Sequence, residues 1–258
     1  MRIQRALFLS DLHLGWVPCR RSHEALLRHL PEAADGCELI VLNGDVLDVH
    51  RGAPGAAERE RIAQLAEQVT TWRGEGREVI YIEGNHDPMG ERLPGGVDLA
   101  PDRWQHRFEG FDGQVIQVFH GHRFDPSPWN PGRYEGYGRH ALRVENALYH
   151  KSLPVRRVYP HSMGWLVGAV GRIEGVLWRP ALVTRSKALR EGADVVVHGH
   201  WHFGPGSDTV GEHPSWRTGS WVADGHRGSV NRILRYERGR FERITLEDGR
   251  WVAPGDGL

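Results

Sequence analysis

The chain of 258 residues has few cysteines, no excess charge of either sign and no long hydrophobic run. Its two cysteines, Cys19 and Cys37, do not form a disulfide framework in a chain of this size, and we expect both to be reduced thiols. Basic and acidic residues are equally numerous, at 33 each. The whole chain therefore has no bias toward nucleic acid or anionic membranes, and any such bias must be local.

The hydrophobic runs are also too short for a membrane protein. No run approaches the roughly 18 apolar residues of a spanning helix, and no apolar segment typical of a secretion signal follows Met1. Internal repeats and low-complexity tracts are absent from the sequence. We therefore expect a soluble, cytoplasmic protein with one α/β domain, a size at which a large core can be buried.

Hydrophobic patterning predicts the main elements. Residues 1 to about 124 alternate apolar runs with helical stretches, which indicates repeated strand-helix units. Arg232–Leu246 contains two alternating runs separated by Arg238-Gly239, which predicts a β-hairpin. The predicted strands are 6–10, 39–42, 79–82 and 195–197. The predicted helices are 22–30 and 56–72.

Five short motifs rich in histidine, aspartate and asparagine occur in a fixed order, and four of them directly follow an apolar run. Because strand ends gather at one edge of an α/β sheet, we expect these side chains to meet there and to supply ligands for two divalent metals. The motifs are Asp11-Leu-His13, Gly44-Asp45, Gly84-Asn85-His86-Asp87, His120-Gly121-His122 and Gly199-His200-Trp201-His202.

Each motif alone has an ordinary structural explanation, such as a helix cap or an Asx turn. Asp11 and His13 are two residues apart, and in an extended backbone such residues point to the same side and can share one ion. His200 and His202 have the same spacing. The occurrence of all five motifs in one chain favours metal binding over five separate structural explanations.

Together these motifs resemble the calcineurin-like metallophosphoesterase superfamily, over residues 11 to 202. The resemblance implies an α/β (α+β) fold, a four-layer αββα sandwich of two mixed β-sheets. It also implies two sets of metal ligands that share Asp45 as a bridging carboxylate. The implied sets are Asp11, His13, Asp45 and His202 for one ion, and Asp45, Asn85, His120 and His200 for the other.

The implied activity is hydrolysis of a phosphoester or pyrophosphate by a metal-bound hydroxide, without a protein nucleophile. The nitrogen and oxygen ligands suit Mn²⁺, Fe or Zn²⁺, and we expect Mn²⁺. His86 resembles the imidazole that does not bind metal in this family and acts as the general acid. Asp48 and Asp87 are alternative partners that could hold His86 protonated.

Residues 125–190 interrupt the strand-helix pattern with several prolines, and we expect a mostly helical insertion within the single domain. This segment has eleven basic and four acidic residues, and it also contains apolar pieces such as 163–170. Arg133, Arg139 and Arg143 are candidate contacts to substrate phosphate. The apolar pieces could pack onto the domain, hold an acyl chain or touch the surface of the inner membrane.

Such an insertion is similar to the lid of the UDP-2,3-diacylglucosamine hydrolase branch, which implies a lipid-like pyrophosphate substrate. Two differences leave the substrate open: that branch often has Arg at the position of His86, and Gly-Asp at the position of Gly121-His122. His86 favours a more general phosphoesterase. The alternatives are a phosphodiesterase or nuclease, although nucleic acid is the less favoured partner, and an inactive metal-binding scaffold, against which the intact ligands argue.

Overall fold

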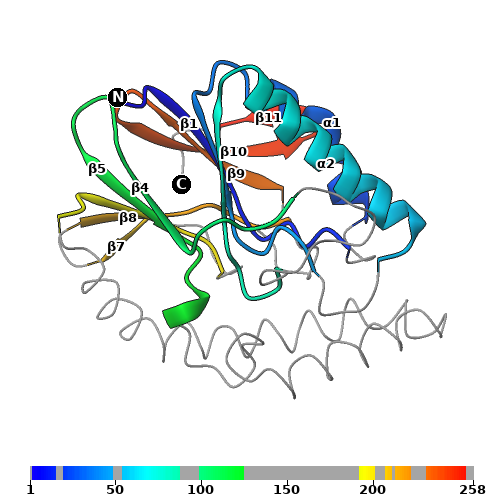
Figure 1. Cartoon of the computed structure of the whole chain (residues 1–258). Coiled ribbons are helices and arrows are strands. Elements are labelled where there is room, and N and C mark those ends of the chain that lie inside the picture. Colours follow the sequence, from blue (N-terminus) through cyan, green and yellow to red (C-terminus); the bar gives the residue numbers. More distant parts are fainter. Residues whose placement is uncertain are drawn as a thin grey trace.

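The computed structural model of the chain describes residues 2–15, 20–48, 54–87, 99–124, 192–200, 207–210, 213–221 and 231–253. The expected insertion at 125–190 lies outside these ranges. Two β-sheets pack face to face, and helices α1 (Arg20–Ala33) and α2 (Ala56–Gly74) lie along one side of the sandwich (Figure 1). No helix in the described ranges combines the length and hydrophobicity needed to span a membrane.

The first sheet has six strands in the order β11-β10-β9-β1-β2-β3. One half of the sheet consists of three parallel strands, β1, β2 and β3, with β3 at the edge. The other half is an antiparallel meander of β9, β10 and β11, in which β9 pairs with β1. The strands are β1 (Arg5–Leu9), β2 (Leu39–Asn43), β3 (Glu78–Ile82), β9 (Arg232–Glu237), β10 (Arg240–Glu247) and β11 (Arg250–Val252).

The second sheet has five strands in the order β4-β5-β6-β8-β7. Strands β5, β6 and β8 are parallel, and the two edge strands are antiparallel to their neighbours. The strands are β4 (Gln105–Glu109), β5 (Val115–Phe119), β6 (Val195–His198), β7 (Ser207–Val210) and β8 (His213–Arg217), and a short 3-10 helix η2 (His122–Phe124) follows β5.

Alternation of side chains along the strands divides the core in two. In β1, Leu7 and Leu9 belong to the cluster that includes apolar residues of α1 and α2, whereas Ala6 and Phe8 belong to the cluster between the sheets. Successive residues of a strand point to opposite faces, so a run buried on both sides must be continuously apolar. This is why the central strands are short apolar runs.

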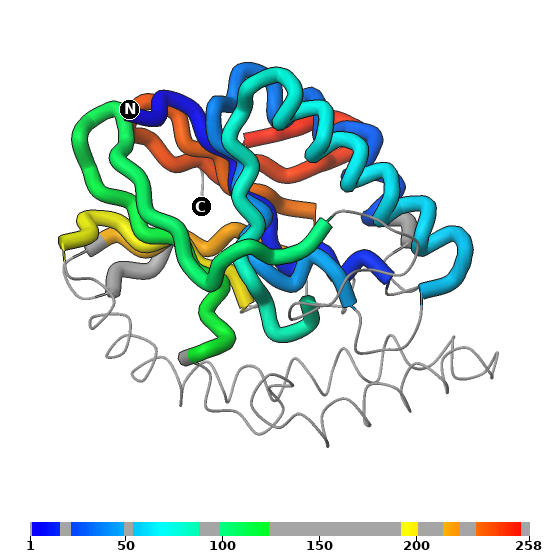
Figure 2. The backbone as a smooth tube through the Cα atoms, viewed as in Figure 1, coloured from blue at the N-terminus to red at the C-terminus, as the bar shows by residue number. Residues whose placement is uncertain are grey.

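The predicted strands, the two helices and the hairpin of β9 and β10 are confirmed. The prediction of strand-helix units up to residue 124 is wrong for residues 105–119. These form the antiparallel pair β4-β5, because the chain reverses in a tight turn in which Gly113 has φ 84° and donates a hydrogen bond to the Gly110 carbonyl. Figure 2 shows this pair as the green hairpin at the left of the molecule.

The two mixed sheets with flanking helices confirm the α/β fold class. The two α-helices described both contribute to the core of the six-stranded sheet, so the described part of the chain contains three of the four expected layers.

Candidate metal centre

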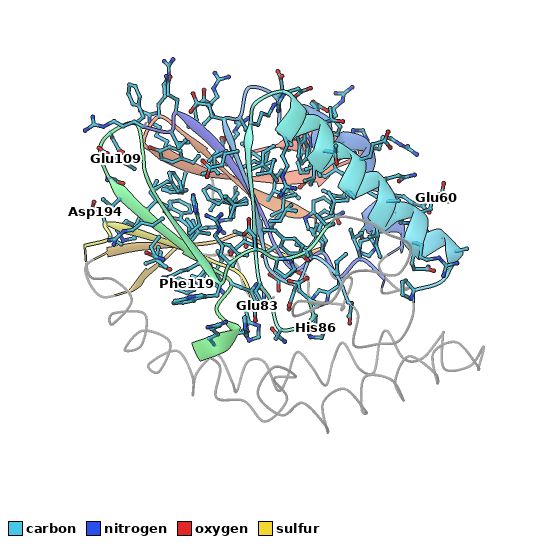
Figure 3. The ribbon with its side chains drawn as sticks, viewed as in Figure 1. Glu60, Glu83, His86, Glu109, Phe119 and Asp194 are labelled. Atoms are coloured by element: carbon cyan, nitrogen blue, oxygen red, sulfur yellow. The ribbon has the colours of Figure 1, made fainter. Side chains whose placement is uncertain are left out.

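The motif loops meet at one end of the sandwich. They follow the carboxyl ends of β1, β2 and β3, which are parallel in the first sheet, and of β5 and β6, which are parallel in the second. Figure 3 shows Glu83, His86 and Phe119 toward this end, and Glu109 and Asp194 at the opposite end. The expected convergence of the motifs is therefore present in the fold.

Backbone hydrogen bonds join the loops to one another. The Asp11 amide donates to the Gly44 carbonyl at 3.0 Å, and the His13 amide donates to the Asp45 carbonyl at 2.9 Å. The His200 amide donates to Asp11 Oδ2 at 3.1 Å, which links the two sheets at the site. Since these contacts involve main-chain groups, the loops hold the functional side chains in fixed positions.

Potential ligand atoms form three overlapping clusters, in each of which the atoms lie within 4.8 Å of one another. Two clusters share Asp45, and together they contain five of the seven predicted ligands. The clusters are Asp11-His13-Asp45, Asp45-His120-His200 and His13-Asp48-His86.

Asp45 occupies the centre of this arrangement. Its Oδ1 accepts a hydrogen bond from the His86 amide at 2.8 Å, while its Oδ2 lies 3.2 Å from His120 Nε2 and 3.7 Å from His13 Nε2. Burial alone would raise the pKa of Asp45, but the nearby imidazoles of His120, His86 and His13 lower this pKa well below its usual range. The carboxylate is therefore ionised and faces imidazoles on both sides.

The contacts of His120 indicate that its Nε2 is suited to a cation. His120 Nδ1 lies 2.8 Å from the Asn43 carbonyl and must donate to it, so in the neutral ring Nε2 presents a lone pair toward Asp45 Oδ2. Burial opposes protonation of His120, but Asp45 raises its pKa to about 9. A proton or a metal ion between these two acceptors removes their repulsion, and a metal would displace the proton.

Four candidate ligands have an unusual backbone conformation. Asp11, His13, Asp45 and His200 have φ of 53°, 48°, 51° and 69°, in the left-handed region that residues with a side chain seldom adopt. The extended geometry expected for Asp11 and His13 is therefore wrong, although both side chains reach the same cluster. Such conformations cost energy, persist only where surrounding contacts impose them, and concentrate at functional sites.

Asp48 joins a candidate ligand to the candidate general acid. Its Oδ1 lies 3.2 Å from His86 Nδ1 and its Oδ2 lies 3.2 Å from His13 Nδ1. The Asp48 side chain is fully buried, whereas the His86 side chain is 13 % exposed. A hydrogen bond from Nδ1 fixes the orientation of the His86 ring and leaves Nε2 for proton transfer.

Asp87 lies in a different environment. It accepts hydrogen bonds from the Asp45, Leu47 and Gly84 amides and from the Tyr81 hydroxyl, and its side chain is fully buried. Burial and the Asp45 carboxylate raise the pKa of Asp87 to about 7, while the hydrogen bonds act against them by favouring the ionised form. Of the two aspartates considered for His86, the geometry favours Asp48.

Three residues near the site, Ser10, Thr218 and His122, were not among the predicted site residues. The Ser10 hydroxyl hydrogen-bonds Asp11 Oδ2 and Thr218 Oγ1, and so ties the loop after β1 to the loop after β8. His122 is buried, and its ring centroid lies 5.5 Å from that of His120. Burial and the neighbouring imidazoles lower the pKa of His122 to about 2, which keeps the ring neutral. His122 could have been noticed from its motif, but Ser10 and Thr218 could not.

The remaining predicted site residues have separate outcomes. Asn85 is buried in the loop after β3, among the motif residues. His202, the second histidine of its motif, lies outside the described residues, as do the three candidate phosphate contacts Arg133, Arg139 and Arg143.

Comparison with protein families adds an independent result. The sequence model described as calcineurin-like phosphoesterase (Metallophos) matches residues 4–204. No curated protein sequence matches the chain.

Solved structures with a distant likeness to the chain were also found. One is a predicted phosphoesterase from Streptococcus pneumoniae, with 14% identity, coverage of 98% of this chain and 99% of that chain, and a TM-score of 0.42. Another is a dimetal phosphatase from Danio rerio, with 12% identity, coverage of 96% and 100%, and a TM-score of 0.40. A nuclease from Pseudomonas putida has 23% identity, coverage of 48% and 55%, and a TM-score of 0.33.

Proposed function

We propose, from the premise that this chain belongs to the calcineurin-like phosphoesterase family, that it hydrolyses a phosphoester whose leaving group is an alcohol. The chain is a metal-dependent phosphoester hydrolase. The observation that most directly supports the proposal is the pair of ligand clusters that share Asp45, beside the buried contact between Asp48 and His86.

The chain's own residues suit two divalent cations. Asp11, His13 and Asp45 would hold one ion, and Asp45, His120 and His200 would hold the other. By resemblance, His202 and Asn85 complete the two sets. Because the ligands are carboxylate, amide and imidazole groups, we propose Mn²⁺, with Fe or Zn²⁺ as substitutes. When bound, such ions polarise phosphoryl oxygens and lower the pKa of water.

His86 would supply the proton for the leaving oxygen. Its side chain is partly exposed, and its Nδ1 contacts a buried carboxylate that favours the protonated ring. Asp48 also contacts His13, so the same carboxylate orients a metal ligand and the acid. Asp48 would thus hold His86 in a fixed position relative to the metals.

The presence of a general acid bears on the substrate class. An alkoxide is a strong base and leaves readily only when it is protonated, whereas a phosphate leaving group of a pyrophosphate is a weak base that departs unaided. General acid catalysis therefore benefits esters of alcohols most. This favours phosphodiesters or monoesters of sugars, nucleosides or other alcohols as substrates.

A lipid-like pyrophosphate is the second candidate substrate. The observation that supports it is the composition of residues 125–190, where eleven basic residues accompany apolar pieces. Arg133, Arg139 and Arg143 would then contact phosphate groups, and the apolar pieces would contact acyl chains or a membrane surface. These residues lie outside the described part of the chain.

A hydrolysis panel with Mn²⁺, run with and without chelator, tests the proposal. We would compare bis-p-nitrophenyl phosphate, p-nitrophenyl phosphate, a dithymidine phosphodiester, single-stranded DNA and UDP-diacylglucosamine. Metal-dependent turnover of alkyl esters supports the alcohol leaving group. If UDP-diacylglucosamine is turned over orders of magnitude faster than every ester, the substrate is a lipid pyrophosphate and not an ester of an alcohol.

Two variants complete the panel. Asp45→Asn should abolish hydrolysis of every substrate while the protein stays folded, and undiminished turnover would refute the shared-carboxylate mechanism. A variant with 125–190 replaced by a short linker should still hydrolyse bis-p-nitrophenyl phosphate if that segment serves substrate binding. If this variant loses activity on all substrates equally, the segment is needed for the fold.

A further inference from the structure

The two loops that contribute the central ligand and the general acid come from neighbouring parallel strands, β2 and β3. Asp87, at the end of the second loop, contacts both of them through its carboxylate. Its Oδ2 lies 2.8 Å from the Asp45 amide and 2.8 Å from the Gly84 amide, and its Oδ1 lies 2.9 Å from the Leu47 amide and 2.5 Å from the Tyr81 hydroxyl.

This set of contacts leaves Asp87 no capacity for other roles. An ionised carboxylate offers about four lone-pair sites, and four donors occupy them here. Asp87 also belongs to none of the ligand clusters found among the described residues. It therefore neither holds a metal nor orients His86.

The same contacts fix the position of Asp45. Its amide is held by Asp87, and its own Oδ1 accepts a hydrogen bond from the amide of His86, the residue next to Asp87. Asp45 is thus held at both main chain and side chain by two consecutive residues. Because its φ of 51° is unfavourable, the conformation needs such contacts to persist.

We propose that Asp87 is the positioning residue that sets the place of the shared carboxylate Asp45 and so allows two metal ions to bind together. The inference rests on the proposed metal site, but it concerns assembly of the site rather than the reaction. Hydrogen bonds to an ionised acceptor are about twice as strong as neutral ones, so the negative charge of Asp87 is part of its function.

The test is Mn²⁺ binding to the full-length metal-free protein at pH 8, measured by calorimetry and by electron paramagnetic resonance. Asp87→Asn retains the shape of the side chain but replaces an acceptor with a donor that opposes the backbone amides. Loss of such a supporting contact typically lowers metal affinity about 10- to 100-fold. We expect a loss of that size, together with loss of the exchange-coupled signal of a bridged Mn²⁺ pair.

A matched pair of tyrosine variants covers the case in which Asp87→Asn does not fold. Tyr81→Phe removes one of the four donors and should weaken Mn²⁺ binding about two- to tenfold. Tyr236→Phe removes a buried hydroxyl that accepts from the Phe111 amide at 2.9 Å, far from the metal loops, and should leave Mn²⁺ binding unchanged.

Wild-type Mn²⁺ affinity and a coupled signal in folded Asp87→Asn would overturn the inference, as would equal effects of the two tyrosine variants. The fate of the proposed function is read separately, from hydrolysis of bis-p-nitrophenyl phosphate by the metal-loaded wild type. A wild-type protein that binds two Mn²⁺ ions without hydrolysing any ester would refute the function and leave the role of Asp87 decided by the binding data.

Discussion

Replacement of Gly84 by alanine should disable the site through one methyl group. A Cβ atom at this position would lie 2.1 Å from the Asp45 amide nitrogen and 2.3 Å from Asp45 Oδ1. Its φ is outside the left-handed region, so alanine suffers no backbone penalty of that kind. Any effect of Gly84→Ala therefore comes from the contact of the added methyl group with Asp45, the shared carboxylate.

The size of the effect follows from these distances. Contacts to Cβ shorter than 3.0 Å do not occur in practice, so Asp45 and Gly84 must separate by about 0.9 Å. Inserting a methyl group into a packed site costs about 1–3 kcal/mol of stability. A displacement of about 1 Å in a catalytic group can cost about 100-fold in rate, and we expect a loss of that order in kcat/KM.

Gly74→Ala is the matched control. Gly74 ends helix α2, and no described atom lies within 4 Å of the position of its Cβ. This variant should be neutral or up to about 1 kcal/mol more stable, with unchanged activity. We would measure thermal unfolding by circular dichroism and Mn²⁺-dependent hydrolysis of bis-p-nitrophenyl phosphate for both. Wild-type kcat/KM in Gly84→Ala would refute the close approach of the two loops.

Three further predictions concern the acid, the metals and pH. His86→Ala should lower kcat by about 10²–10⁴-fold, most for alkyl leaving groups, while bound metal measured by elemental analysis stays constant; loss of metal would make His86 a ligand. Chelation should abolish hydrolysis. It should also lower the free energy of unfolding by about 2.7 kcal/mol relative to protein in a free metal concentration of 100 times the dissociation constant. An unchanged unfolding midpoint would contradict metal binding. Burial lowers the pKa of His23 from 6.5 to about 4, so the unfolded chain binds the extra proton and stability falls as pH drops from 6.5 toward 4. Denaturant unfolding of the metal-free protein should show this loss, up to ~3 kcal/mol, in the wild type relative to His23→Gln, and parallel pH profiles would contradict it.

The strands of the core could be predicted from the sequence because each is an apolar run that is buried on both faces. Leu39–Leu42 and Val79–Ile82 lie between the helices and the second sheet, and this environment requires continuous hydrophobicity. The order of the strands could not be predicted in the same way. That β9 pairs with β1 depends on contacts between residues distant in the chain, such as Leu234 with Phe8, which local patterning does not encode.

For the candidate site, too, the sequence predicted which residues take part but not how they contact one another. The motifs identified the loops and the residue types, because carboxylate, amide and imidazole groups are common ligands of divalent metals. The choice between Asp48 and Asp87 as the partner of His86 was not available from the sequence, since both are acidic and both lie near the motif histidines. The path of the loops decides it: Asp48 Oδ1 lies 3.2 Å from His86 Nδ1, while backbone amides surround Asp87.

The backbone strain at the site could not be predicted, and it explains why the supporting residues matter. Within the described ranges, seven residues other than glycine have a left-handed φ, and four of these are candidate ligands. Of the other three, Arg238 and Asp248 lie in hairpin turns, where such conformations are ordinary, and Asn231 directly precedes β9. A ligand loop has no such local reason, so its conformation must be imposed by contacts such as those of Asp87 and Ser10. Each of these contacts offsets part of a cost on the order of 1–3 kcal/mol per strained residue. The loops should therefore relax when either contact is removed, and metal affinity should fall before global stability does.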